Sequence, residues 1–283
     1  MIQYGDQTKI PQLKKLWKVC FADEDAYIDD FFTAMYQNEH VLLEEENGVL
    51  MGASFFLPGE IWLEQPETAG SWQPVRYVYA LAVYPQYRGK GIAARLLQTA
   101  RRLYDAPLIA EPAEEGLIQG FYEPHGFVKN FYLKKHAVEI PHYDVKAAQT
   151  DSWQWTPVNA AQYRRIRDAH FQKHGYISWP QRHIAFAIQQ HSNNGGGALL
   201  LTASDRKELM LYLIETQGQE KKLIITETTL SESEARHILI PHITGACSSL
   251  VCTGPSDDVC EDRLTGMSAG LPAIYGYINL TLD

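Results

Sequence analysis

A glycine-rich turn between an apolar strand and an amphipathic helix constrains this 283-residue chain more than any other feature. Residues 77–83 read YVYALAV, and their aromatic and β-branched side chains predict a buried strand that ends before Pro85. Gly89 and Gly91 follow, and a helical pattern begins near Ile92. Glycine permits positive φ, so several N–H groups and the positive end of a helix dipole can face one anion. The turn therefore predicts a pyrophosphate-binding loop.

Composition restricts the class of protein and its partners. A hydrophobic content of 45% is typical of a globular protein, and no run of eighteen apolar residues predicts a membrane span. The first six residues carry no signal sequence, so we expect a soluble, cytoplasmic protein. A net charge of −9 disfavours nucleic acid and is compatible with a cationic amine as partner. Cys247, Cys252 and Cys260 lack a CxxC pair, so we expect reduced thiols and no metal site.

Periodicity in the first half predicts a strand, two helices, a meander of strands, a helix and further strands. The Asn47-Gly48 dipeptide is typical of a two-residue hairpin. The predicted helices are residues 6–21, 25–36, 92–104 and 115–122, and the predicted strands are 40–45, 49–57, 77–83, 108–111 and two closing strands within 127–138.

The second half repeats this order of elements. Strands are predicted at 153–158, 198–203, 209–216, 222–228 and 249–253, and helices at 160–174, 179–190 and 231–243. The repetition suggests a structural duplication with low residue identity between the halves. We therefore expect an α/β protein with layered α+β character, in which a mixed, mostly antiparallel sheet flanked by helices occurs twice, in domains 1–143 and 150–283.

The second copy lacks the glycine turn. Leu230-Ser231-Glu232-Ser233-Glu234 stands at that position, where Ser231 and Glu234 form a capping box and the carboxylates repel phosphate. We expect that this half binds no nucleotide, and that it shapes an acceptor cleft or makes a homodimer contact. Trp179, Tyr212 and His237 could line such a cleft, although ordinary packing accounts for each of them more simply.

Two motifs together resemble a known family. The run Arg88-Gly89-Lys90-Gly91-Ile92-Ala93 fits the signature that GNAT N-acetyltransferases carry after an apolar strand. About thirty residues further on, Phe121-Tyr122 with Gly126-Phe127 is similar to a second family segment. Two motifs at this distance are far more specific than one, and the resemblance covers roughly the first 140 residues.

The resemblance implies an acetyl-CoA-dependent transfer of an acetyl group to an amine by direct attack in a ternary complex. It implies that Tyr122 returns a proton to the leaving thiolate and that Glu111, or otherwise Glu114, Glu115, Glu123 or water, accepts the proton of the amine. His125 fits a turn residue better than a base. The implied donor-binding residues are Leu81, Ala82 and Val83, on a strand that splays from its neighbour, and Arg88, Gly89, Lys90, Gly91, Ile92 and Ala93, whose amides take the pyrophosphate.

The same residues are compatible with two further functions. Gly89, Gly91 and Ala94 also satisfy the Rossmann fingerprint, and Glu111 lies twenty residues beyond Gly91, as in an NAD(P) oxidoreductase. Residues 84–88 separate the strand from the first glycine, however, which weakens that alternative. The chain could also bind acyl-CoA as a non-catalytic sensor or partner module. In that case Tyr122 could be a core aromatic and Glu111 a helix cap. The sequence leaves the amine open between polyamine, aminoglycoside, amino acid and protein N-terminus.

Overall fold

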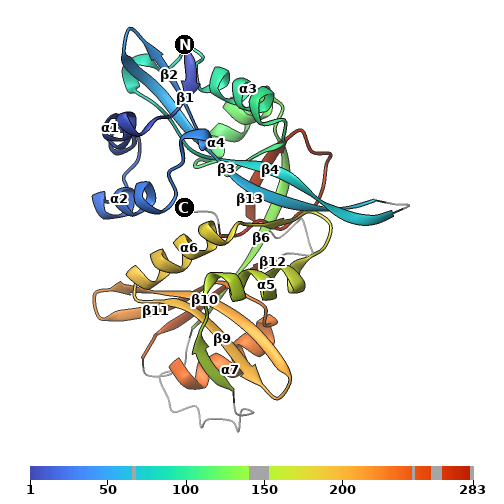
Figure 1. Ribbon diagram of the computed structural model, residues 1–283. Coiled ribbons are helices and arrows are strands. Elements are labelled where there is room, and N and C mark those ends of the chain that lie inside the picture. Colours follow the sequence, from blue (N-terminus) through green and yellow to red (C-terminus); the bar gives the residue numbers. More distant parts are fainter. Residues whose placement is uncertain (66–67, 140–152, 244–245, 256–262, 281–283) are drawn as a thin grey trace. The chain divides into compact units, whose positions relative to one another are not determined.

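The computed structural model describes residues 1–65, 68–139, 153–243, 246–255 and 263–280 (Figure 1). The chain divides into two compact units. Unit 1 comprises residues 1–131 and 265–275, and unit 2 comprises residues 132–264 and 276–283. This division differs from the expected domains 1–143 and 150–283, because a C-terminal segment returns to unit 1. The expected junction at 144–149 lies outside the described residues.

Unit 1 is built on a mixed sheet in the strand order β1-β2-β3-β4-β5-β13-β6. Neighbouring strands are antiparallel from β1 to β4, β5 is parallel to β4, and β13 is antiparallel to β5. The strands are β1 (Ile2–Tyr4), β2 (Val41–Glu46), β3 (Val49–Gln65), β4 (Thr68–Val83), β5 (Leu108–Ala110), β13 (Arg263–Ala269) and the start of β6 (Val128–Glu139).

Helices cover both faces of this sheet. A Cβ on Gly52 would lie 2.9 Å from Ile92 Cγ2 of α3 (Ile92–Tyr104), whereas Ala53 lines a cavity with Leu13 and Trp17 of α1 (Ile10–Cys20). Successive strand residues point to opposite faces, so α3 and α1 pack on opposite sides. On the α1 side, with α2 (Asp25–Ala34), the Trp17 ring lies 4.8 Å from the Phe31 ring and 5.6 Å from that of Tyr79. This aromatic cluster forms the core of that layer.

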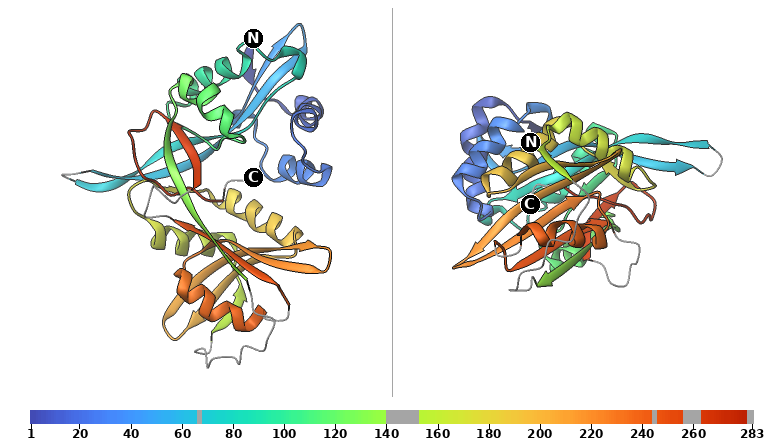
Figure 2. Two further views of the ribbon diagram at one scale, coloured as in Figure 1. Left: turned by 180° about the vertical axis from the view of Figure 1, so that it is seen from behind. Right: turned by 90° about the horizontal axis from the view of Figure 1, so that it is seen from below.

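The hairpin between β2 and β3 has the predicted turn. Asn47 and Gly48 both have positive φ, of 50° and 79°, as a type I′ turn requires. Beyond this hairpin, β3 and β4 stay paired as far as Gln65 and Thr68, well past the predicted strands 49–57 and 77–83. They continue as the two-stranded arm seen in Figures 1 and 2.

Unit 2 repeats the element order and the pairing of unit 1, which confirms that the mixed α/β architecture occurs twice. Its sheet runs β7-β9-β10-β11-β12-β6, with antiparallel neighbours except for the parallel pair β11 and β12. Its elements are β7 (Gln154–Pro157), α5 (Ala160–Phe171), β8 (Tyr176–Ser178), α6 (Gln181–Asn193), β9 (Gly197–Ala203), β10 (Arg206–Gln217), β11 (Glu220–Thr228), α7 (Glu232–Ile243) and β12 (Ser249–Pro255).

The strand that closes each sheet comes from the other half of the chain. In unit 1, β13 takes the place beside β5, with Ser268 opposite Ile109. In unit 2, β6 takes the place beside β12, with Ala137 opposite Val251. The prediction of two closing strands within 127–138 is therefore wrong. Residues 128–139 form one continuous strand, β6, which lies between β13 and β12 in the strand order.

Candidate active site

The end of β4 continues past the end of β5. Their parallel ladder joins only Arg76 to Leu108, Tyr77 to Ile109 and Val78 to Ala110, whereas β4 continues to Val83. Across the other edge, the register with β3 shifts between Ala53 and Phe55. The backbone of the predicted donor-binding residues Leu81, Ala82 and Val83 thus extends beyond the last residue of β5.

Ala80 lies in this part of β4. Its φ of +48° is unusual for a residue with a side chain, and such strain is concentrated at functional sites. The residue lines a small cavity on the α1 face, together with Trp17, Phe21 and Phe55. Nearby, the Tyr27 and Tyr79 hydroxyls lie 2.6 Å apart. Sequence reasoning missed this feature, because a bulge depends on the register with β3 and leaves no local signal.

The glycine turn joins β4 to α3 through η3 (Pro85–Tyr87). Gly89 and Gly91 have φ of +77° and +73°, and Gly91 is the N-cap of α3. A Cβ at Gly89 would meet nothing within 4 Å. Gly89 is therefore required for its backbone conformation rather than for space.

The turn presents free amides. Among the described residues, the N–H groups of Gly89, Lys90 and Gly91 donate to no protein acceptor. The first N–H groups of α3, at Ile92 and Ala93, have no partner within the helix. These five amides coincide with five of the six predicted loop residues. Together with the helix dipole they can bind an anionic group.

Arg95 holds the turn in place from within α3. Its Nη1 donates to the Lys90 carbonyl at 2.7 Å, and its Nη2 donates to Glu44 Oε1 at 2.6 Å. Its Nε lies 3.1 and 3.2 Å from the two Glu44 oxygens. Glu44 is buried on β2, and its hydrogen bonds raise the pKa of Arg95. The Lys90 carbonyl therefore points toward Arg95, a residue near the start of α3.

The two basic side chains of the turn are directed at the protein itself. Arg88 Nε donates to the Val83 carbonyl at 3.2 Å, and the Lys90 ammonium lies 5.2 Å from the centre of the Tyr87 ring. Arg88 therefore ties the turn back to the end of β4. The backbone amides, rather than these side chains, are what the turn offers to a ligand in this arrangement.

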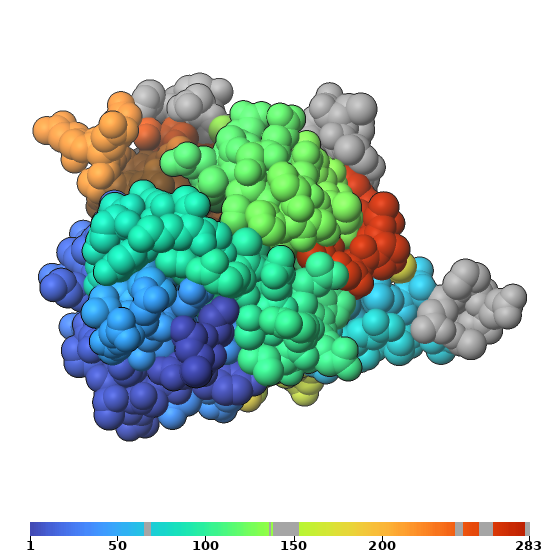
Figure 3. Space-filling model, turned by 90° about the horizontal axis from the view of Figure 1, so that it is seen from above, coloured from blue at the N-terminus to red at the C-terminus, as the bar shows by residue number. Residues whose placement is uncertain are grey.

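Tyr122 and Glu111 occupy the segment after β5. Glu111 directly follows Ala110, which is paired with Val78 at the point where the β4–β5 ladder stops. Tyr122 ends the π-helical turn η4 (Ile118–Tyr122), which follows α4 (Glu115–Leu117). The segment 115–125 lies beside α3 on the face of unit 1 shown in Figure 3.

The second motif folds around Tyr122. This side chain is buried, and its ring lies 5.2 Å from the rings of both Phe121 and Phe127. Gly126 has φ of +81° and reverses the chain, so that the Phe127 amide donates to the Tyr122 carbonyl at 3.1 Å. His125 Nδ1 lies 2.6 Å from the Phe121 carbonyl, within the 3-10 turn η5 (Glu123–His125). His125 is thus part of the turn.

Unit 2 has different groups at the corresponding places. At the start of α7 the Ser231 amide donates to Glu234 Oε2 at 3.0 Å, and the Glu234 amide donates to Ser231 Oγ at 3.4 Å, which confirms the predicted capping box. Glu227 is the second-to-last residue of β11, as Ala82 is of β4. Its buried carboxylate accepts from Arg167 Nε, Tyr163 and Tyr277, each at 2.8 Å.

The three residues predicted to line a cleft, Trp179, Tyr212 and His237, all lie in unit 2, where Tyr212 packs against the hydrophobic core. Trp179 is fully buried, donates to the Asn279 carbonyl at 2.6 Å and stacks on His183, whereas His237 is exposed. Cys20, Cys247 and Cys252 are free thiols, and Cys260 lies outside the described residues. In the described part of the chain, no group of three or more His, Cys, Asp or Glu could hold a metal ion. No described helix is long and apolar enough to cross a membrane.

The first part of the chain matches a known protein-family model. Residues 2–108 match the model of the acetyltransferase (GNAT) domain. These residues form a GNAT domain. The match includes β4, the glycine turn and α3, and it ends at the first residue of β5. No curated protein sequence matches the chain.

Solved structures share the fold of the GNAT domain and of the rest of the chain. A GCN5-related N-acetyltransferase from Anabaena variabilis is 16% identical with a TM-score of 0.72, over 95% of this chain and 72% of that protein. A probable N-acyltransferase from Enterococcus faecalis is 12% identical with a TM-score of 0.69, over the same shares. Eis1 from Mycobacterium abscessus is 13% identical with a TM-score of 0.66, over 100% of this chain and 74% of that protein.

The Rossmann alternative does not fit these findings. Strand β4 is antiparallel to β3, and the sheet from β1 to β4 is antiparallel throughout, whereas dinucleotide-binding folds are mostly parallel. The family match names an acetyltransferase domain. The glycine turn is therefore interpreted as that of a GNAT domain.

Proposed function

We propose that unit 1 transfers an acetyl group from acetyl-CoA to an amine, by direct attack in a ternary complex. The observation that carries the proposal is the set of free amides at Gly89, Lys90 and Gly91, which η3 joins to a strand that continues past its β5 partner. The turn fits a pyrophosphate, and the end of β4 beyond β5 fits an extended arm that pairs with backbone groups. The glycine turn and this end of β4 follow one another along the chain, which favours acetyl-CoA over a smaller phosphate compound.

The chemistry that we assign to the side chains follows from their pKa requirements. An amine must lose a proton before it attacks, and Glu111, directly after β5, is our candidate for the base. The CoA thiolate, with a pKa near ~8.5, must regain a proton, which a tyrosine with a pKa of about 10 can supply. Tyr122 is our candidate for this acid. Backbone N–H groups at the end of β4 are suited to polarise the acetyl carbonyl.

The acceptor is proposed to be a cationic amine. The α1–α2 connection carries Asp23 and Glu24, and the Asp23 carboxylate accepts from Trp17 Nε1 at 2.7 Å. Trp17 also lines the small cavity at Ala80, so this acidic connection is anchored to the wall of that cavity. Negative charge here attracts an ammonium group before its deprotonation. The acetyl donor and the amine would then approach β4 from different sides.

Unit 2 is proposed to bind no nucleotide. The Ser231–Glu234 capping box already fills the N-terminus of α7, and Glu227 with Arg167 fills the end of β11. A second donor site would have to displace both sets of contacts. We therefore propose one acetyl-CoA site per chain.

Thiol release from acetyl-CoA in the presence of a panel of amines tests the proposal. The full chain should release CoA with at least one amine, and acetyl-CoA alone should raise its melting temperature. Double replacement of Gly89 and Gly91 by valine should abolish both effects, whereas Ser231→Ala with Ser233→Ala should change neither. Binding without turnover would favour the sensor alternative. Absence of binding would refute the proposal.

A further inference from the structure

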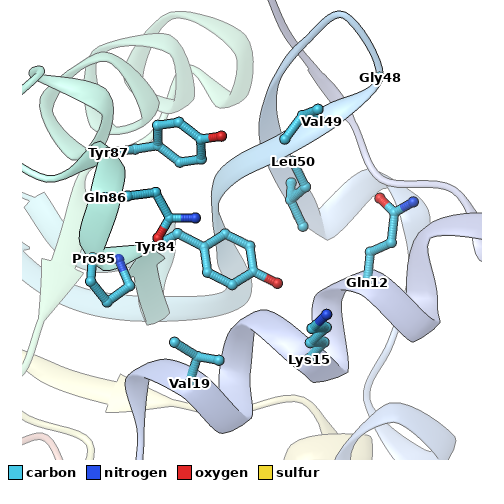
Figure 4. A pocket seen from close by; sticks show the side chains of 10 residues that line it. All are labelled: Gln12, Lys15, Val19, Gly48, Val49, Leu50, Tyr84, Pro85, Gln86 and Tyr87. Atoms are coloured by element: carbon cyan, nitrogen blue, oxygen red, sulfur yellow. The ribbon is translucent and has the colours of Figure 1, made fainter.

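A hollow of about 590 Å³ lies beside the glycine turn, on the opposite edge of β4 from β5. Figure 4 shows its three walls, formed by α1, by the turn and first residues of β3 at 48–50, and by residues 84–87. All of these residues belong to unit 1. Its lining includes none of the residues 81–83 and 88–93 that are assigned to the acetyl donor.

Lys15 gives this hollow a positive charge. Its neighbours on α1 are paired, since Lys14 lies 2.6 Å from Asp29 and Lys18 lies 2.8 Å from Asp25. Lys15 has no such partner in the described part of the chain. Figure 4 shows it at the wall of the hollow, toward the space that Tyr84 borders. Lys15 is exposed, and as the one cation among the residues that line the hollow its ammonium favours an anionic ligand over a cationic one.

Tyr84 adds a hydrogen-bond donor. Its backbone amide donates to the Met51 carbonyl at 3.0 Å, which fixes the residue against β3. Its hydroxyl has no hydrogen-bond partner among the described residues and is directed into the hollow in Figure 4. The half-buried position raises the pKa of Tyr84, so the hydroxyl keeps its proton at neutral pH. A protonated hydroxyl can donate to the same anion as Lys15.

Apolar groups surround these two polar ones. Val19 and Val49 are both about half exposed, at 48% and 49%, and they border the hollow from opposite walls. Pro85 and Tyr87 complete the apolar rim. Exposed apolar side chains gathered around a concave surface with a few polar groups are typical of small-molecule sites.

We propose that this hollow binds a small aromatic carboxylate. The carboxylate is held by the Lys15 ammonium and the Tyr84 hydroxyl, and the flat apolar body lies against Val19, Val49 and Pro85. A phosphate ester fits less well, because a dianion calls for more cations than the single one that lines the hollow. The Lys15 ammonium would repel a cationic ligand.

Titration of the full chain with 2-naphthoate, followed by calorimetry, tests this proposal without acetyl-CoA. Lys15→Met should weaken binding about tenfold, because it removes a charge-assisted hydrogen bond. Lys18→Met is the matched control on the same helix and should leave the affinity unchanged, since Lys18 is paired with Asp25. Tyr84→Phe should weaken binding less than Lys15→Met does. The neutral analogue 2-naphthylmethanol should bind wild type and Lys15→Met equally.

Three results would overturn the proposal. They are no binding of 2-naphthoate at millimolar concentration, equal affinity of Lys15→Met and wild type, and competition between 2-naphthoate and acetyl-CoA. The last would mean that the hollow belongs to the donor site. Simultaneous binding of both compounds supports two sites. If the chain binds 2-naphthoate through Lys15 but no acetyl-CoA, only the proposed acetyl transfer fails.

Discussion

Arg95 joins the buried carboxylate of Glu44 to the backbone of the glycine turn. One guanidinium donates to both Glu44 oxygens and, through Nη1, to the Lys90 carbonyl at 2.7 Å. The turn therefore owes its shape to a contact between β2 and α3 as well as to its glycines. Such support positions the amides before a ligand arrives, which lowers the entropic cost of binding.

Arg95→Ala should weaken acetyl-CoA binding about tenfold, because the Lys90 carbonyl loses its donor and the turn loses its support. It should also lower the free energy of unfolding by about 1–2 kcal/mol, since Glu44 is left buried without its partner while Arg95 itself is partly exposed and screened. Arg102→Ala, further along α3, is the control. Equal acetyl-CoA affinity in the two variants would contradict the positioning role.

Gly89 should tolerate asparagine better than valine. A Cβ there meets no neighbour, so the penalty comes only from φ of +77°, which asparagine adopts far more readily than a β-branched residue. Gly89→Val is expected to raise the Kd for acetyl-CoA about tenfold, and Gly89→Asn to stay within a few-fold of wild type. Calorimetric titration measures both. If Gly89→Asn raised the Kd as much as Gly89→Val, the penalty would come from the volume of the side chain rather than from its backbone conformation.

Tyr122→Phe should lower kcat by about a hundredfold if the hydroxyl is the general acid. The Kd for acetyl-CoA should not change. The melting temperature should stay close to that of wild type, because the ring contacts with Phe121 and Phe127 are retained. Steady-state kinetics and thermal unfolding separate these effects. Unchanged turnover would remove Tyr122 from the mechanism.

Glu234→Gln should destabilise the protein in a pH-dependent way. Hydrogen bonds from Ser231 and Arg206 lower the pKa of Glu234 below its ordinary value of 4.5. A lowered folded-state pKa means that the stabilisation is present above pH 4.5 and is lost as the pH falls through the folded-state value. We expect about 0.5 kcal/mol at pH 7, discounted because Glu234 is more than a third exposed. Urea unfolding of both forms at pH 7 and below pH 4 checks the trend.

Glu227→Gln should be the most destabilising of these changes, by about 3 kcal/mol, because it leaves the Arg167 charge buried without its partner. Tyr163 and Tyr277 would also lose their acceptor. Since the change lies in unit 2, acetyl-CoA affinity at a temperature where the protein is folded should stay the same. Urea denaturation and calorimetry measure the two quantities. A loss of donor binding would contradict a single site in unit 1.

Local pattern alone predicted several helix bounds, turns and caps. The helix at 92–104 has the bounds that were expected, the Asn47-Gly48 turn has the expected positive φ at both residues, and the Ser231–Glu234 capping box forms. Each depends on contacts within a few residues, where side-chain spacing and backbone preference decide the conformation. The glycine turn belongs to this class, because positive φ at Gly89 and Gly91 is a local requirement.

Only the tertiary structure decided which distant segments meet. Strand β13 was not expected, and residues 128–139 continue as one strand, because pairing partners more than a hundred residues away carry no local signal. The bulge at Ala80, which the register with β3 creates, and the contact between Arg95 and Glu44 also join residues that are not neighbours in sequence, so they leave no local signal either. The sequence thus specified the amide-bearing turn, whereas tertiary contacts fixed the register of β4 beside it and held the turn through Arg95.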